Sequence, residues 1–91
     1  MTMTREQQYE EEKMLYKTLG DKNNLFVTEI YHEKHMLYGD IVCILIEWGD
    51  WKHEHLRCDW LMQEMGYTFL GSETTEEDGS DTYSAIRRYT K

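Results

Sequence analysis

Apolar residues recur at helical spacing between Tyr9 and Leu19, near the start of the chain. Residues 4–7 (TREQ) precede them and have the form of a capping box, in which a threonine hydroxyl and a glutamine side chain satisfy free backbone N–H groups. Gly20 follows the last periodic residue and is a typical helix stop. The pattern therefore predicts a helix over residues 5–19.

Two runs rich in β-branched and aromatic residues come next, LFVTEIY at 25–31 and IVCILIEW at 41–48. The second run is the most apolar of the chain and has strand length, so we interpret it as a strand buried on both faces. The segment between the runs fits a hairpin that turns at residues 33–34 or at 39–40. A short helix over 29–38 is the alternative, and the pattern favours the hairpin.

The second half of the chain predicts a helix over 51–65, with Asp50 as its N-cap and Gly66 as its stop. Residues 67–72 and 82–89 have strand-like composition, and an Asp-Gly turn dipeptide lies between them. The predicted order of elements is therefore helix, strand, strand, helix, strand, strand.

This α-β-β-α-β-β order predicts an α+β fold in one domain, residues 1–91. Moving the last strand to the front gives β-α-β-β-α-β, the ferredoxin-like arrangement. We therefore expect a permuted ferredoxin-like fold, a four-stranded antiparallel sheet with two helices on one face. The analogy concerns shape and implies no activity.

Charge narrows the classes of partner. The chain has 91 residues and a formal net charge of −8, with 18 acidic against 10 basic residues. This balance disfavours nucleic acid and anionic membrane surfaces as partners, and it permits a basic protein. The polar N-terminus, the lack of a membrane-length apolar run and two isolated cysteines, Cys43 and Cys58, predict a cytoplasmic protein with reduced thiols.

The topology places the acidic segment 76–81 at the same sheet edge as the start of the second helix and the end of the first. Lys52, His53 and His55 lie in the first turns of that helix, where the helix dipole disfavours cations. The simplest interpretation is an ionic clasp that holds the acidic hairpin to the helix start. Nearby carboxylates would then raise the pKa of the histidines.

A metal site is the alternative interpretation of this edge. His53 and His55 are two residues apart on a helix and point in different directions, whereas His55 and Cys58 share one face. Neither this pair nor the separate pair His32 and His35 has the spacing of a known zinc motif, so we predict no metal or other cofactor. No nucleophile elbow or glycine-rich phosphate loop is present, and we predict that the protein is not an enzyme.

Two further features indicate surfaces for protein contact. Trp60 falls opposite Trp51 on the second helix, where an exposed tryptophan would be a suitable interface anchor. In the predicted fold one sheet face carries no helix, although strand 41–48 is apolar on both sides. A homodimer through this open sheet face, or a partner protein, would cover it.

The motif GDWKHEH, followed by EEDGSDTYSA, resembles a pattern in small proteins of bacteria, phages and mobile elements. The resemblance covers about residues 46–89 and carries no activity with it. It implies only that the residues of the two motifs occur together, and it adds Tyr83 to the candidates. The predicted interaction residues are Asp50, Trp51, Lys52, His53, His55, Trp60, Glu76, Glu77, Asp78, Asp81 and Tyr83.

These features predict a small acidic, non-enzymatic interaction domain that binds a basic protein. The most specific form of the prediction is an inhibitor from a phage or mobile element, similar in kind to anti-CRISPR proteins, that blocks a basic host protein such as a nuclease. The alternative is a metal- or ligand-responsive module that uses His53, His55 and the acidic segment 76–81.

Overall fold

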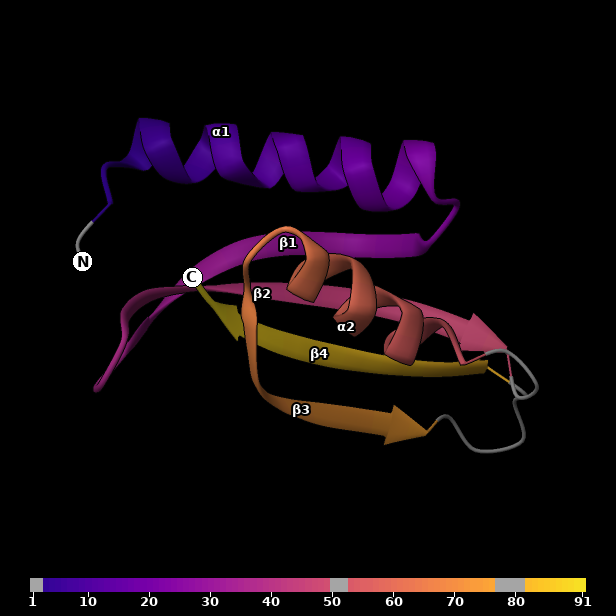
Figure 1. The fold of residues 1–91 in the computed structure, drawn as a ribbon. Helices are drawn as coiled ribbons and strands as arrows, with labels where there is room; N and C mark the ends of the chain where they lie inside the picture. The colour runs from indigo at the N-terminus through magenta and orange to yellow at the C-terminus, as the bar shows by residue number, and fades with distance from the viewer. Residues whose placement is uncertain (1–2, 50–52, 77–81) are drawn as a thin grey trace.

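The computed structural model describes residues 3–49, 53–76 and 82–91; the side chains of 75, 76 and 82 are not described. Figure 1 shows its elements in chain order. They are helix α1 (Arg5–Leu15), π-helix η1 (Tyr16–Lys22), strands β1 (Phe26–His35) and β2 (Gly39–Gly49), helix α2 (Glu54–Glu64), and strands β3 (Thr68–Glu76) and β4 (Thr82–Thr90).

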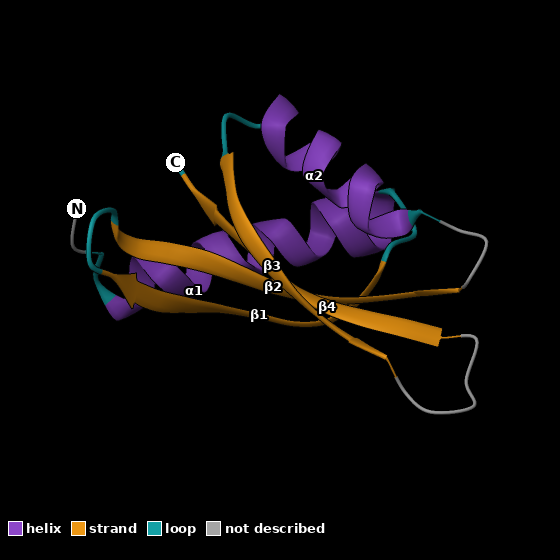
Figure 2. Ribbon diagram, turned by 90° about the horizontal axis from the view of Figure 1, so that it is seen from below, coloured by secondary structure: helices purple, strands orange, loops and turns teal. Residues whose placement is uncertain are grey.

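The four strands form one antiparallel sheet in the order β1-β2-β4-β3. This is the strand order of a permuted ferredoxin-like fold, so the predicted fold class is confirmed. Helix α1 runs along β1, and α2 lies across β2, β4 and β3 (Figures 1 and 2). Side chains of both helices meet one face of the sheet in a single core, which contains Leu15, Leu19, Ile44, Cys58 and Met62.

The predicted capping box forms at the start of α1. The Gln7 N–H donates to the Thr4 hydroxyl at 3.1 Å, and the Thr4 N–H donates to the Gln7 side chain at 2.9 Å. The predicted stop at Gly20 is wrong, because the chain continues through it as a π-helix to Lys22. Asn24 ends the helix instead, since its φ of 57° is in the left-handed region.

Tyr16 ties this helical extension to an irregularity in β1. The register of β1 on β2 shifts between Val27 and Glu29, as in a β-bulge. The Tyr16 hydroxyl accepts from the Ile30 N–H at 3.0 Å and donates to the Thr28 carbonyl at 3.3 Å. It therefore supplies hydrogen bonds to backbone groups at the position where the strand is irregular.

Substitution of Tyr16 by phenylalanine is expected to lower the free energy of unfolding by about 1–2 kcal/mol, because both hydrogen bonds are lost while the ring is retained. Urea denaturation measures this change. The matched control is Tyr9→Phe on the exposed side of α1, for which we expect less than about 0.5 kcal/mol. Equal effects of the two substitutions would contradict the role assigned to the Tyr16 hydroxyl.

The β1–β2 connection is a hairpin, as predicted, but it turns at residues 36–38 and not at either predicted position. His35 pairs with Gly39, so the strands are longer than their apolar runs indicated. Gly39 has a φ of 74°, which suits the residue that closes a three-residue hairpin loop. In Figure 1 this turn projects from the sheet.

Two predicted boundaries in the second half are corrected. Helix α2 begins at Glu54 after His53, so the N-cap is not Asp50 and the helix is shorter at its start than predicted. Strand β3 continues to Glu76, beyond the predicted end at residue 72, because its threonine-rich second half pairs along β4. The predicted stop at Gly66 is confirmed, with a φ of 94°.

The sheet face without helices is covered in part by side chains of the sheet itself. Arg88 of β4 bridges Glu33 of β1 at 3.2 Å and Glu73 of β3 at 3.1 Å, and these charged side chains span the middle of the face. Cys43 lies in this region and is fully buried. Burial and the nearby Glu33 carboxylate raise the pKa of the Cys43 thiol to about 11. A second copy of the chain is therefore not needed to bury Cys43.

Candidate functional site

The sequence-predicted site divides into residues that the structure describes and residues outside its described parts. Asp50, Trp51, Lys52, Glu77, Asp78 and Asp81 lie outside, and of Glu76 only the backbone is described, at the end of β3. His53, His55, Trp60 and Tyr83 are described. The predicted clasp between helix start and acidic hairpin therefore stays a prediction.

Trp48, at the end of β2, brings two of these residues together. Its ring lies 4.4 Å from the His55 ring and 5.9 Å from the Tyr83 ring, between centroids. His53 lies further along the same row, with its ring 6.1 Å from that of His55. The Trp48 ring thus contacts both the His55 ring and the Tyr83 ring, and the three form one aromatic cluster.

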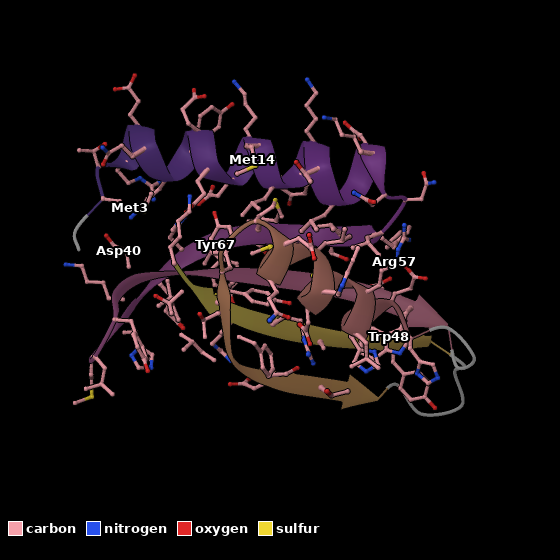
Figure 3. All side chains as sticks on the ribbon, viewed as in Figure 1. Met3, Met14, Asp40, Trp48, Arg57 and Tyr67 are labelled. Atoms are coloured by element: carbon pink, nitrogen blue, oxygen red, sulfur yellow. The ribbon has the colours of Figure 1, made fainter. Side chains whose placement is uncertain are left out.

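An open cleft of about 490 Å³ adjoins this cluster. Phe26 at the start of β1 and Trp48 and Glu47 at the end of β2 line it, together with Glu54 and Arg57 of α2. Figure 3 shows Trp48 and Arg57 at one end of the sheet, opposite Met3 and Asp40. Asn24, just after the end of the first helical segment, also lines the cleft. This supports the prediction that the first helix ends at the same sheet edge at which the second helix starts.

The electrostatics of His55 differ from the prediction. Burial and the nearby Arg87 guanidinium lower the pKa of His55, against a smaller opposing effect of Asp59. Its Nδ1 atom is buried and finds no hydrogen-bond partner among the described residues. The ring therefore packs as a neutral imidazole against Trp48, and the expectation of a raised pKa is wrong for His55.

A pH dependence follows from this lowered pKa. The unfolded chain binds a proton at His55 near pH 6.5, whereas the folded chain resists protonation until a lower pH. Stability contributed by His55 is therefore present above pH 6.5 and is lost as the pH falls through the folded pKa. In His55→Gln we expect a smaller loss of melting temperature between pH 7 and 5 than in the wild type. Equal losses in both proteins would contradict the assignment.

Trp60 is exposed, as the helical pattern predicted, with 59% of its surface accessible. Leu56 lies one turn earlier on α2 and is also largely exposed. The two residues form an apolar pair on the outer side of the helix, because positions four apart share a face. This pair is one of the surfaces among the described residues that suit contact with another protein.

The described residues offer no metal centre and no activated thiol. In the described ranges, no three His, Cys, Asp or Glu side chains are placed so that they could hold one ion. Cys58 is fully buried, and burial raises the pKa of its thiol to about 11, in spite of a hydrogen bond with Tyr89 that lowers it. Such a thiol is a poor nucleophile at neutral pH.

A buried ion pair joins α2 to β4, and sequence reasoning missed it. Arg87 is 7% exposed and contacts Asp59 with two of its nitrogens, one of them at 3.1 Å. The Tyr89 hydroxyl also donates to Asp59, and the guanidinium carbon lies 4.4 Å from the centre of the Phe69 ring. The alternation of apolar and polar residues in 82–89 places residue 87 on the core side of the strand. That position of an arginine was the available sign of a buried charge.

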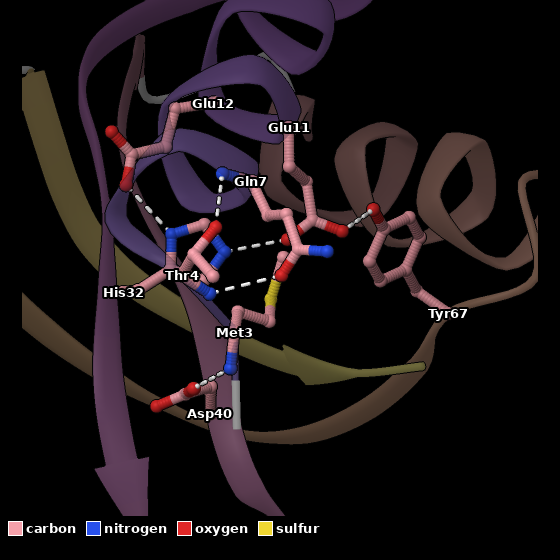
Figure 4. A network of polar contacts seen from close by, with 8 residues as sticks. All are labelled: Met3, Thr4, Gln7, Glu11, Glu12, His32, Asp40 and Tyr67. Carbon is pink, nitrogen blue, oxygen red and sulfur yellow. Dashed lines mark hydrogen bonds and ion pairs between the residues drawn. The ribbon is translucent and has the colours of Figure 1, made fainter. Parts of the chain in front are cut away.

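A second network connects α1 to β1 and to the segment before β3 (Figure 4). The His32 side chain is 3% exposed and lies between two carboxylates, with Nε2 at 2.5 Å from Glu11 and Nδ1 at 2.6 Å from Glu12. Each ring nitrogen therefore contacts a different carboxylate of α1, and His32 joins both glutamates to β1. The Tyr67 hydroxyl donates to the other Glu11 oxygen at 2.6 Å.

The β1–β2 turn carries the most exposed apolar side chains among the described residues. Met36 is fully exposed, and Leu37 is 81% exposed. The turn is held by its own contacts, because the Leu37 N–H donates to His35 Nδ1 at 3.1 Å and the Tyr38 ring lies 5.0 Å from the His35 ring. We call residues 36–38 the hairpin tip.

A cavity of about 380 Å³ lies beside the hairpin tip, between the start of α1, the hairpin and the end of β4. Its lining combines aromatic and charged residues, among them Glu11, Tyr38, Asp40, Tyr67 and Lys91, with apolar and neutral polar ones. We call it the hairpin cavity. The tip and the cavity share Tyr38 and form one continuous surface at the opposite end of the sheet from Trp48.

Comparisons with known proteins add no assignment: no protein-family model, curated protein or solved structure matches the chain. Among the described residues, no helix has both the length and the apolar character needed to cross a membrane.

Proposed function

We propose that this chain is an acidic protein-binding domain that attaches to a basic protein through its hairpin tip. The observation that carries the proposal is the exposure of Met36 and Leu37 on a turn whose backbone is held in place. Apolar side chains at such a position are buried when they enter a pocket of another protein. The burial contributes about 1.5–3 kcal/mol to the binding free energy for each residue fully buried. A turn that is already ordered loses little conformational entropy on binding.

The net charge of −8 supports a basic partner over a neutral one. Proteins that bind nucleic acid have cationic surfaces, because phosphates require lysine and arginine. The most specific form of the proposal is therefore an inhibitor, of the kind that phages and mobile elements encode, which occupies such a surface on a host nuclease.

The test is a photo-crosslinking experiment in the source cells, with a photoreactive residue in place of Leu37 and, separately, in place of Leu56. We expect crosslinks from position 37 to a basic protein, identified by mass spectrometry. Purified partner should then bind Leu37→Ser about tenfold more weakly than wild type, since one buried leucine corresponds to at least about 1.4 kcal/mol. Affinity should also fall as salt is raised.

Leu56→Ser is the matched control, because it removes an exposed leucine from the other apolar surface. If Leu56→Ser weakens binding and Leu37→Ser does not, the interface is the outer side of α2 with Trp60, and the assignment to the hairpin tip is wrong. If neither substitution affects binding and salt has no influence, the proposed function fails altogether.

A further inference from the structure

The hairpin cavity has the chemistry of a site for a positively charged side chain. Two carboxylates, Glu11 and Asp40, line it together with the rings of Tyr38 and Tyr67. Glu11 already accepts from the Tyr67 hydroxyl and contacts His32 Nε2, and Asp40 accepts from the Met3 N–H at 2.6 Å, so both carboxylates are oriented by the fold. A carboxylate group can accept about four hydrogen bonds, and both groups therefore retain capacity for a further donor.

The chain itself places a cation in this cavity. The Lys91 ammonium nitrogen lies 5.2 Å from the centre of the Tyr67 ring, within the range of a cation–π interaction. Lys91 is an exposed residue and lines the same cavity as the two carboxylates. The Tyr67 ring and its neighbours thus accommodate an ammonium group, and that group comes from a side chain that can leave into water.

We propose that the hairpin cavity binds a lysine or arginine side chain of the partner, in the place that Lys91 occupies in the free protein. The inference rests on the proposed function, because it names the chemistry that the partner presents beside its apolar pocket. The ligand's cation contacts the Tyr67 ring and donates hydrogen bonds to Asp40 and Glu11, while Tyr38 covers its alkyl chain. Lysine and arginine side chains have an apolar stem and a charged end, and so suit a cavity with both aromatic and acidic walls.

The probes are the methylamides of Nα-acetyl-lysine and Nα-acetylarginine, titrated into the full chain and followed by amide NMR spectra. We expect saturable shifts at residues 11, 38–40 and 67. The neutral Nε-acetylated form of the lysine probe should produce no such shifts, because it lacks the charge. Shifts that spread over all acidic surfaces without saturation would overturn the proposal.

Two substitutions sharpen the test. Lys91→Met removes the competing ammonium and should tighten probe binding about threefold, and Asp40→Asn should weaken it about threefold, as expected for loss of one partly exposed charge contact. Lys17→Met is the matched control, because it removes an exposed lysine from the helical extension and should leave probe affinity unchanged. Unchanged affinity in both Lys91→Met and Asp40→Asn would also overturn the proposal.

This experiment separates the inference from the proposed function. The Leu37→Ser variant should bind the lysine probe as the wild type does, because the tip leucine does not line the cavity. If the probe binds in the cavity but the Leu37→Ser substitution does not change the affinity for the partner, the cavity assignment is supported and the assignment to the hairpin tip is wrong. Partner binding that depends on Leu37, without any probe binding, would reject the cavity alone.

Discussion

Asp59→Ala is expected to lower the free energy of unfolding by about 3–5 kcal/mol, because it leaves the Arg87 guanidinium buried without a partner. The Arg87 side chain is 8% exposed, and Asp59 is its ion-pair partner across the α2–β4 contact. The Tyr89 hydroxyl loses its carboxylate acceptor in the same substitution. Domains of this size are stable by about 5–15 kcal/mol, so the variant should be close to unfolding at physiological temperature. Urea denaturation followed by tryptophan fluorescence measures the loss.

Two further variants identify the cause. Asp59→Leu combined with Arg87→Met should recover much of the loss, since an apolar pair of similar volume leaves no buried charge unpaired. Glu54→Ala breaks an ion pair on the same helix with Arg57, 3.7 Å away and exposed, and should cost less than about 1 kcal/mol. An Asp59→Ala effect as small as that of Glu54→Ala would show that the buried pair contributes little to stability.

His32→Ala is expected to lower the free energy of unfolding by about 2–3 kcal/mol, because two partly buried carboxylates then face each other without a donor between them. The Glu11 and Glu12 side chains are only 14% and 24% exposed, so water replaces the imidazole incompletely. His32 links β1 to α1 through both of its ring nitrogens. Amide hydrogen exchange should therefore increase mainly in α1.

Addition of Glu11→Gln and Glu12→Gln to His32→Ala should restore part of the stability, since the repulsion between carboxylates is removed. Lys34→Ala, at a neighbouring exposed position of β1, is the control and should change stability by less than about 0.5 kcal/mol. If the triple variant is no more stable than His32→Ala, the loss comes from the missing side-chain volume and not from unpaired charge.

Local signals in the sequence were sufficient for the order of elements. The TREQ capping box and Gly66 have fixed local geometries, and each occurs where the sequence predicted it. Gly20 did not mark the end of the helix, because a glycine can adopt the left-handed conformation but does not have to. Asn24 takes that position instead, and the Asn23 side chain supports the turn with a hydrogen bond to the Thr18 carbonyl at 2.6 Å.

The polar networks could not be predicted in the same way, because they join residues far apart in the chain. Asp59 and Arg87 meet only through the α2–β4 contact, and Glu11 meets Tyr67 across an even larger separation. No spacing within one element signals such a pair. The motif GDWKHEH, whose polar groups are close in sequence, therefore became the predicted site. The hairpin tip lies in the segment HMLYG, whose pattern indicates only a connection between strands.

Both described ends of the chain lie at the proposed binding surface, since Met3 and Lys91 line the hairpin cavity. An affinity tag fused before residue 3 or after residue 91 would therefore be anchored beside that surface and would shield it from a large partner. Immobilisation through either end would likewise turn the surface toward the solid support. Attachment through an exposed side chain at the other end of the sheet, such as Phe26 replaced by cysteine, keeps the surface accessible.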